Sequence, residues 1–156
     1  MRPPFPPVAL FLLLISTALH ETPSFLTIVQ RPSDFCGTDV RGIEYWVQDA
    51  MPCSVLNGVE DTLEELVQAT EAADGELEGV SLIFTEDFVR CGPAKTVGCT
   101  FHTVSVVTRT HPRWQSVLKH ELGHHLLKRR GGPWRNGDSK HENSAWWKVV
   151  DGNGRY

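Results

Sequence analysis

The chain has 156 residues, of which 40% are hydrophobic and 22% charged, a balance typical of one globular domain and not of a disordered or fibrous chain. Its net charge of −4 provides no basic surface for nucleic acid or anionic lipid, so we expect neither as a partner. One hydrophobic core is therefore expected, and the function has to be sought in individual motifs.

The first residues have the pattern of a signal peptide. Arg2 precedes the apolar run Val8–Ile15, and small residues ending at Ala18 occupy the usual cleavage positions. The apolar run is far shorter than the ~20 residues that span a bilayer, which favours release over a membrane anchor. We predict a signal peptide over residues 1–18 and a single domain over residues 19–156 of a secreted or extracytoplasmic protein. Loss of Arg2 would change the net charge from −4 to −5.

An even number of cysteines in an exported chain indicates disulfide bonds. The four are Cys36, Cys53, Cys91 and Cys99. Of the three possible pairings we favour Cys36–Cys53 with Cys91–Cys99, because each bond closes a short local loop at low entropic cost. A second zinc site is the alternative, although the spacings contain no C-x-x-C pattern.

Five elements are predicted before the last third of the chain. Phe25–Val29 is rich in β-forming residues and predicts a strand, whereas apolar residues at helical spacing predict a helix over residues 40–50. A second helix is expected from a sequence resembling a capping box at residues 57–60 to a stop near Gly75. Val80–Thr85 and Thr100–Val107 have the composition of strands, and we expect the disulfide between them to fasten their connection.

The next predicted element contains the H-E-x-x-H pattern of zinc-dependent hydrolases. Because an α-helix advances about 100° per residue, His120 and His124 stand one turn apart on one face, where both can reach one metal ion. Glu121 is too close in sequence to His120 to be a comfortable third ligand, but its carboxylate can reach a metal-bound water. We therefore predict that Glu121 is a general base.

A bare H-E-x-x-H pattern also arises by chance on solvated helices. Here the pattern lies in an amphipathic segment, since Leu118, Leu122 and Leu126 recur on the opposite side. Basic residues and then Gly131 end this helix. Because the H-E-x-x-H pattern lies in a helix with a core face, we favour a zinc site over a chance match.

The possible third ligands are Asp138, His141 and Glu142, which follow a loop over residues 131–137. Imidazole is the commonest third ligand in such sites, so we place His141 first, Asp138 second and Glu142 last. His102 and His111 are also near the motif in sequence. Surface or capping roles are commoner for such histidines, and we leave both out of the site.

With these residues in view, roughly the last fifty residues resemble the metzincin clan of zinc peptidases, particularly its matrixin-like members. Those enzymes continue as H-E-x-x-H-x-x-G-x-x-H and then turn around a methionine beneath the metal. His120, Glu121 and His124 match that pattern, whereas Leu127 stands at the glycine and Trp146 at the methionine. The register of that family would place the third ligand at Asp138, eight residues before Trp146.

The resemblance implies an α+β, zincin-like domain, in which a mixed sheet of about four short strands packs against the zinc helix and one or two further helices. It also places Thr100–Val107 near the cleft, where a strand edge can pair with an extended peptide. The runner-up resemblance is to the gluzincin type, whose third ligand is a glutamate from a second helix. Glu142, followed by a possible helix over Ser144–Val150, fits that type.

These observations predict a secreted zinc-dependent endopeptidase with one Zn²⁺ ion and a protein or peptide substrate. A zinc-bound water would attack the peptide bond, with Glu121 as general base. The alternative is an exported zinc-binding or inhibitor-like module that has lost turnover, as Leu127 and Trp146 suggest. Glu121 favours the enzyme, because a module that only binds metal has no obvious need for a carboxylate there. A disulfide-bonded domain without metal is the third possibility.

Overall fold

The computed structural model of this chain describes residues 21–152. The helices are α1 (Phe25–Val29), α2 (Val59–Thr70), α3 (Trp114–Arg130) and α4 (Ser144–Asp151), with 3₁₀ turns at Cys53–Leu56 and Gly132–Trp134. The strands are β1 (Asp34–Thr38), β2 (Glu44–Val47), β3 (Ser81–Thr85), β4 (Val89–Cys91), β5 (Ala94–Thr96), β6 (Gly98–Phe101) and β7 (Val104–Thr108). The predicted signal peptide over residues 1–18 lies outside the described residues.

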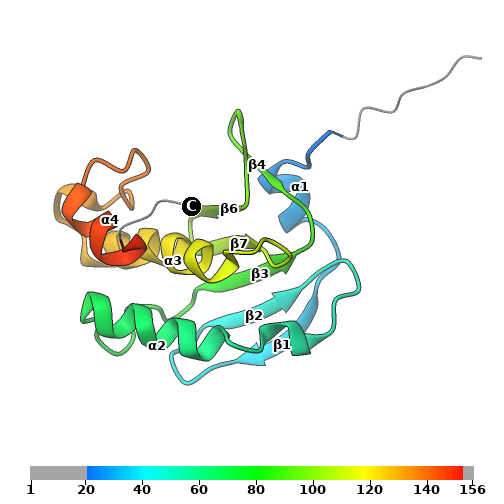
Figure 1. Cartoon of the computed structure of the whole chain (residues 1–156), viewed down its shortest axis with the longest axis horizontal. Coiled ribbons are helices and arrows are strands. Elements are labelled where there is room, and N and C mark those ends of the chain that lie inside the picture. The colour runs from blue at the N-terminus through cyan, green and yellow to red at the C-terminus, as the bar shows by residue number, and fades with distance from the viewer. Residues whose placement is uncertain (1–20, 153–156) are drawn as a thin grey trace, which may run out of the picture.

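Five strands form one mixed sheet in the order β1-β2-β3-β7-β6 (Figure 1). Strands β2, β3 and β7 run parallel, whereas β1 and β6 are antiparallel to their neighbours at the two edges. Strands β4 and β5 pair separately as a hairpin. The predicted α+β class is confirmed, and the main sheet has one strand more than the four expected.

Different helices cover the two faces of the sheet. Leu82 and Phe84 of β3 belong to the main core, which also contains the buried faces of α2 and α3. Ile83, between them in sequence, points to the other face and joins Ile28 of α1 in a smaller core. Helix α4 lies against α3 (Figure 1). The long helix α3 is therefore held between the sheet and α4.

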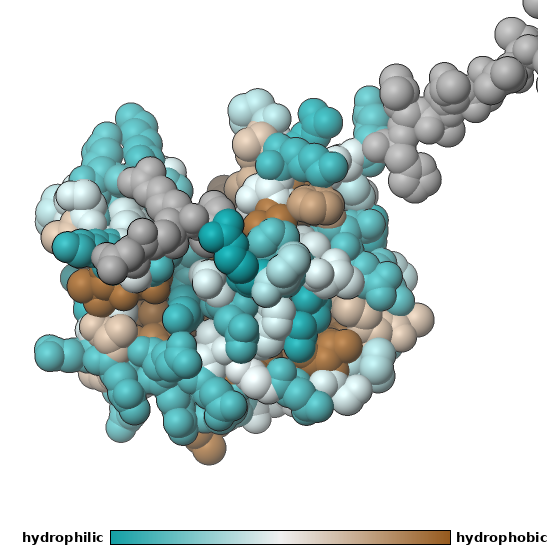
Figure 2. All heavy atoms as spheres, in the orientation of Figure 1, coloured by the Kyte–Doolittle hydropathy of each residue, from teal (hydrophilic) through white to brown (hydrophobic). Residues whose placement is uncertain are grey.

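The face of the molecule in Figure 2 is mostly hydrophilic, and its apolar side chains form separate small patches. The exposed large apolar side chains include Phe35, Phe88 and Phe101. Single apolar side chains on a surface are normal and identify no partner by themselves. Among residues 21–152, no helix is long and apolar enough to cross a membrane.

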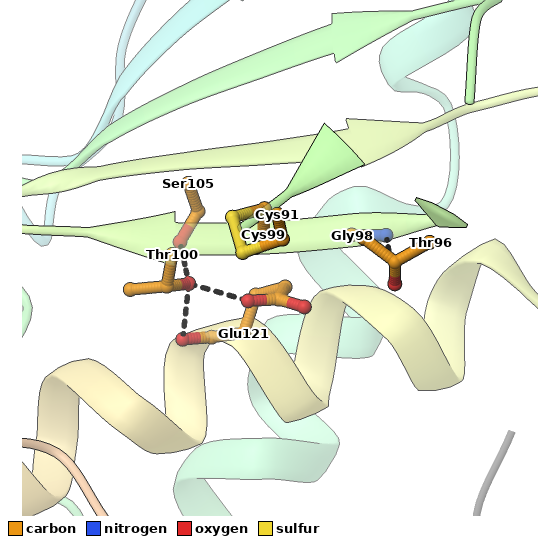
Figure 3. Close-up of a disulfide and its surroundings, with 7 residues drawn as sticks. All are labelled: Cys91, Thr96, Gly98, Cys99, Thr100, Ser105 and Glu121. Atoms are coloured by element: carbon orange, nitrogen blue, oxygen red, sulfur yellow. Dashed lines mark hydrogen bonds between the residues drawn. A yellow bond between two sulfur atoms is a disulfide. The ribbon is translucent and has the colours of Figure 1, made fainter. Parts of the chain in front are cut away.

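Two disulfides connect neighbouring elements, and the predicted pairing is confirmed. Cys36–Cys53 joins β1 to the 3₁₀ turn before α2, and Cys91–Cys99 joins β4 to β6 (Figure 3). No described cysteine is free, so a zinc site built from cysteines is ruled out for residues 21–152. Two disulfides indicate an oxidising, extracytoplasmic environment.

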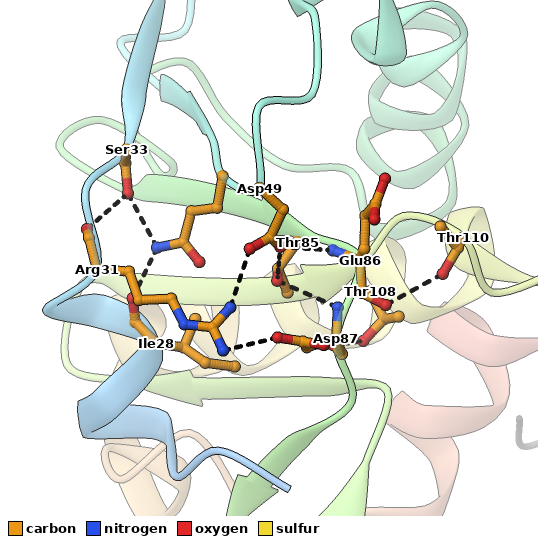
Figure 4. A network of polar contacts seen from close by, with 10 residues as sticks. Ile28, Arg31, Ser33, Asp49, Thr85, Glu86, Asp87, Thr108 and Thr110 are labelled. Carbon is orange, nitrogen blue, oxygen red and sulfur yellow. Dashed lines mark hydrogen bonds and ion pairs between the residues drawn. The ribbon is translucent and has the colours of Figure 1, made fainter. Parts of the chain in front are cut away.

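Phe25–Val29 is the helix α1, and the predicted strand is wrong. Ser24 begins the helix by accepting a hydrogen bond from the backbone N–H of Thr27. Tertiary contacts hold the end of this segment: Gln48 Nε2 donates to the carbonyl oxygen of Ile28 at 2.6 Å, and Arg31 bridges two aspartates (Figure 4). A capping serine and these contacts outweigh the β propensity of the five residues.

Residues 40–50 contain β2 and the turn before it, and the predicted helix is wrong. The carboxylate of Asp39 accepts bonds from the backbone N–H groups of Arg41 and Ile43, which closes a turn between β1 and β2. Tyr45 and Val47 are buried on one face of β2, at the two-residue spacing of a strand. The helical period was read from Val40, Ile43, Val47 and Ala50, but Val40 is exposed, and pairing with β1 and β3 selected the strand.

Thr100–Val107 was predicted as one strand but forms the hairpin β6–β7. Gly98 pairs with Val107 and Phe101 with Val104, so the chain reverses at His102 and Thr103. His102 has a φ of 55°, a left-handed conformation. Glycine or asparagine at this position would have indicated the turn, but neither is present. The prediction of Val80–Thr85 is confirmed as β3.

Helices α2 and α3 were both predicted, and α4 covers the possible helix over Ser144–Val150. Helix α3 ends at Gly131 as expected, with three basic residues in its last turn. The capping box predicted for α2 is wrong, because Gly58 is the N-cap and no side chain bonds there. Glu71, in a left-handed conformation, ends α2 before Gly75.

Candidate metal centre

Three histidines from two segments of the chain lie close together. His120 and His124 come from the helix, and His141 comes from the loop between α3 and α4. One ring nitrogen from each lies within 4.8 Å of the others. Three imidazoles at this separation can hold one metal ion, and the donor set suits zinc, copper, iron or nickel.

Hydrogen bonds fix the two helical imidazoles in the orientation that a metal requires. His120 Nδ1 donates to the Asp151 carboxylate at 2.9 Å, and His124 Nδ1 donates to the carbonyl oxygen of Gly137 at 2.6 Å. Because both acceptors lack a proton, Nδ1 is the donor in each bond, and Nε2 carries the lone pair in the neutral form of the ring. Partners of this kind orient metal-binding histidines and increase their basicity.

The third imidazole contacts the first directly. His120 Nε2 lies 2.8 Å from His141 Nε2, the distance of a hydrogen bond in which only one nitrogen carries the proton. The tautomers of the two rings decide which nitrogen donates. A bound cation would take the place of that proton.

The surroundings keep His124 neutral. Burial, followed by the neighbouring His120 and His141, lowers the pKa of His124 to about 4, although the bond to Gly137 acts in the opposite direction. Neutral imidazole is the form that binds a metal ion. At neutral pH the ring is thus ready for coordination without losing a proton.

An indole forms the floor of this group, and it belongs to Trp147. The ring centroid of Trp147 lies 4.5 Å from that of His120, 4.6 Å from His124 and 4.8 Å from His141. The sequence register pointed to Trp146, which instead lies near the guanidinium of Arg130. Neighbouring residues of a helix point about 100° apart, so only one of the two tryptophans can face the histidines.

Asp138 lies near the group but serves the loop. Its carboxylate accepts bonds from the backbone N–H groups of Glu142 and Asn143 and from Trp147 Nε1, at 2.7–2.9 Å. Burial would raise the pKa of Asp138, but these three bonds outweigh it and lower the pKa below the ordinary value. The structure therefore brings His141 to the helical histidines, whereas Asp138 fixes the turn that carries His141. Glu142 is exposed and outside the group.

Glu121 is buried beside the histidines. Only 3% of it is exposed, and Thr100 Oγ1 donates to its Oε2 at 2.6 Å (Figure 3). A cleft of about 610 Å³ is lined by Glu121 together with all three histidines of the group. A carboxylate and three imidazoles that share one cleft can act on the same bound molecule.

The other two histidines considered in the sequence do not join the group. His102 lines the same cleft from the β6–β7 turn. His111 accepts a bond from the backbone N–H of Arg113 just before α3, a local turn role. Leaving both out of the metal centre agrees with the geometry.

Four contributors to the centre were missed in the sequence: Thr100, Gly137, Trp147 and Asp151. Of the four, only Gly137 has a residue type that points to a special backbone position. Its φ is 77°, and an added Cβ would lie 2.9 Å from the carbonyl oxygen of His124. Asp151 sits at the end of α4, 31 residues from its partner His120. No local pattern connects residues so far apart.

Comparisons of this chain with profiles of known protein families, with curated proteins and with solved structures found no match. The site therefore has to be interpreted from its own geometry.

Proposed function

We propose that this protein is an exported zinc-dependent endopeptidase with a metzincin-like, and more narrowly matrixin-like, active site. The observation that carries the proposal is a buried carboxylate, Glu121, in the same cleft as three imidazoles that can hold one metal ion. A site that only stores metal has no need of this carboxylate. The two disulfides support an extracytoplasmic location.

His120, His124 and His141 would hold the zinc ion, and their hydrogen-bonded Nδ1 atoms support that role. The bound metal would supply a Lewis acid for the carbonyl group and lower the pKa of a water molecule toward ~7. Glu121 accepts a proton as water attacks the carbonyl carbon and passes it to the nitrogen of the breaking C–N bond. Trp147 packs against all three imidazoles.

Strand β6 gives this proposal a place for the substrate backbone. It ends the main sheet, and among the described residues it forms a ladder only with β7. Its residue Thr100 contacts Glu121, so the strand borders the proposed catalytic base. An extended peptide can add to such an edge through backbone hydrogen bonds.

The gluzincin type is less well supported, because Glu142 is exposed and outside the three-histidine group. The departures at Leu127 and Trp146 keep a second function open: an exported zinc-binding or inhibitor-like module without turnover. In the structure Leu127 is buried in the main core, and Trp147 supplies the floor, so neither departure leaves a gap in the centre.

The test combines metal analysis of the purified protein with cleavage of unfolded protein substrates. We expect one zinc per chain and cleavage that stops with a chelator and returns with zinc. Glu121→Gln should keep the metal and lose cleavage, because both helical imidazoles remain. Glu64→Gln, on the exposed side of α2, is the matched control and should cleave normally. A zinc-loaded protein without any cleavage would select the binding module instead.

A further inference from the structure

A line of four polar side chains connects two positions of α3 through the sheet. Glu121 Oε2 lies 2.6 Å from Thr100 Oγ1, Thr100 Oγ1 lies 2.6 Å from Ser105 Oγ, and Ser105 Oγ lies 2.9 Å from His125 Nε2. Thr100 and Ser105 are direct partners across β6 and β7. Glu121, Ser105 and His125 are each at most 5% exposed. Three of the four side chains are therefore interior, and the partly buried Thr100 joins them.

The hydrogens of this line can point in only one direction when Glu121 is ionised. Thr100 has two acceptors on Glu121, the carboxylate Oε2 at 2.6 Å and the backbone carbonyl oxygen at 3.1 Å, and it gives its single hydrogen mainly to the closer, charged one. Thr100 must then accept from Ser105, whose own hydrogen is used in that bond. Ser105 must accept in turn from His125 Nε2. Three donors in series thus point at one carboxylate oxygen, and each bond polarises the next.

The other carboxylate oxygen is confined by shape. A Cβ added at Gly98 would lie 2.6 Å from Glu121 Oε1 and 2.5 Å from Val117 Cγ1, so only glycine leaves room for the side chain. Gly98 and Thr100 are two residues apart and face the same side of β6. Figure 3 shows the Glu121 carboxylate under this part of the strand, within reach of the Thr100 hydroxyl.

We propose that Thr100 is a positioning residue, which holds the carboxylate of Glu121 in its working orientation through a hydroxyl that Ser105 and His125 orient. The kinetic part of this inference rests on the proposed peptidase function, whereas the contact itself does not. A buried carboxylate is costly without donors, and a charge-assisted hydroxyl bond offsets that cost. A base held in one orientation loses less freedom when the proton is transferred.

The kinetic test uses Thr100→Val, which keeps the size and β-branching of threonine and removes only the hydroxyl. We expect kcat for peptide cleavage to fall by roughly 10–100-fold, as for other residues that orient a catalytic group, with KM and zinc content unchanged. Thr100→Ser should retain most of the activity. Thr38→Val is the matched control, since Thr38 is exposed on β1 at the opposite edge of the sheet.

A double variant checks that Thr100 acts through Glu121. Thr100→Val should leave the residual, slow cleavage rate of a Glu121→Gln variant unchanged, because the carboxylate that the hydroxyl positions is already gone. Ser105→Ala should cost less than Thr100→Val, since it removes the donor to Thr100 and leaves the bond to Glu121. Wild-type kcat in Thr100→Val, or equal losses in both backgrounds, would overturn the inference while leaving the peptidase function intact.

If the protein does not cleave peptides, the proposed function is wrong, but the contact between Thr100 and Glu121 can still be tested by a second measurement. Denaturant unfolding is measured for wild type, Thr100→Val, Glu121→Ala and the double variant. A hydrogen bond to a charged group should appear as a coupling of about tenfold or more in the unfolding equilibrium constant. If the product of the two single-variant effects on the unfolding equilibrium constant equals the effect of the double variant to within twofold, Thr100 does not hold Glu121.

Discussion

Helix α3 and the segment of residues 137–151 both contribute to the candidate metal centre, but different interactions place their side chains. On α3, the helix itself sets His120 and His124 one turn apart, and ten of its residues are buried. In the segment, three residues adopt left-handed conformations: Gly137, Asp138 and His141. The segment has little regular structure before α4, so side-chain hydrogen bonds hold His141 in place.

The position of the loop histidine is more sensitive to substitution than the spacing of the two helical ones. A substitution on α3 that keeps the helix leaves the spacing of its histidines intact. The position of His141 depends on the carboxylate of Asp138, and that of His120 depends on the carboxylate of Asp151 from the far end of α4. We therefore expect substitutions of polar residues in the segment to change metal binding even where they touch no metal.

The largest effect should come from His141→Ala. If His141 is the third ligand, zinc affinity should fall by far more than the ~100-fold expected for a residue that only supports a ligand. Competition with a chelator measures the affinity, and circular dichroism checks the fold. His111→Ala is the matched control, since His111 lies outside the group. Unchanged affinity in His141→Ala would remove the segment from the metal centre altogether.

Asp151→Asn should have the next largest effect on the metal. The substitution replaces the charged acceptor of His120 Nδ1–H with a neutral amide, and loss of such a partner typically weakens metal binding by ~10–100-fold. Asp74→Asn, at an exposed position after α2, removes the same charge without a contact to the centre. Equal affinities of the two variants would mean that Asp151 does not support His120.

Asp138→Asn should act mainly on the stability of the segment. It puts an amide NH₂ among three donors, and we expect a loss of about 2–3 kcal/mol in the free energy of unfolding at pH 7. Since folding lowers the pKa of Asp138, its stabilisation is present above the unfolded pKa of ~3.9 and is lost as the pH falls through the folded pKa.

The wild type and Asp138→Asn should therefore become more similar in stability below about pH 4. Unfolding with a chelator present, at pH 7 and at pH 3, measures this without a contribution from metal release. A difference that stays constant between the two pH values would contradict the assigned role of the carboxylate.

The smallest effect is expected from Gly123→Ala, where the two regions touch. An added Cβ would lie 3.1 Å from both Trp147 and Val150 of α4, tighter than an ordinary contact. Alanine otherwise favours a helix over glycine by about 0.8–1.0 kcal/mol. We expect crowding to cancel that gain and to lower zinc affinity by less than ~10-fold. Ser116→Ala on the same helix serves as control, and a clear stabilisation by Gly123→Ala would show that α4 yields easily.

The sequence by itself determined the local features of this protein. The spacing of His120 and His124, the end of α3 at Gly131 and the two short disulfide loops all follow from interactions between residues close in the chain. Short apolar segments were ambiguous, because the β propensity of Phe25–Val29 and the helical spacing in residues 40–50 did not decide the structure that forms. Pairing with distant strands and contacts with Gln48 decided those two cases.

Only the tertiary structure decided what surrounds the two helical histidines. The choice of His141 over Asp138 depends on left-handed backbone conformations in a loop, and the choice of Trp147 over Trp146 depends on how α4 packs on α3. Thr100 reaches Glu121 only because the chain reverses at His102 and makes β6 an edge strand. Each of these contacts joins residues that are far apart in sequence, so its energy is set by packing and not by any local pattern.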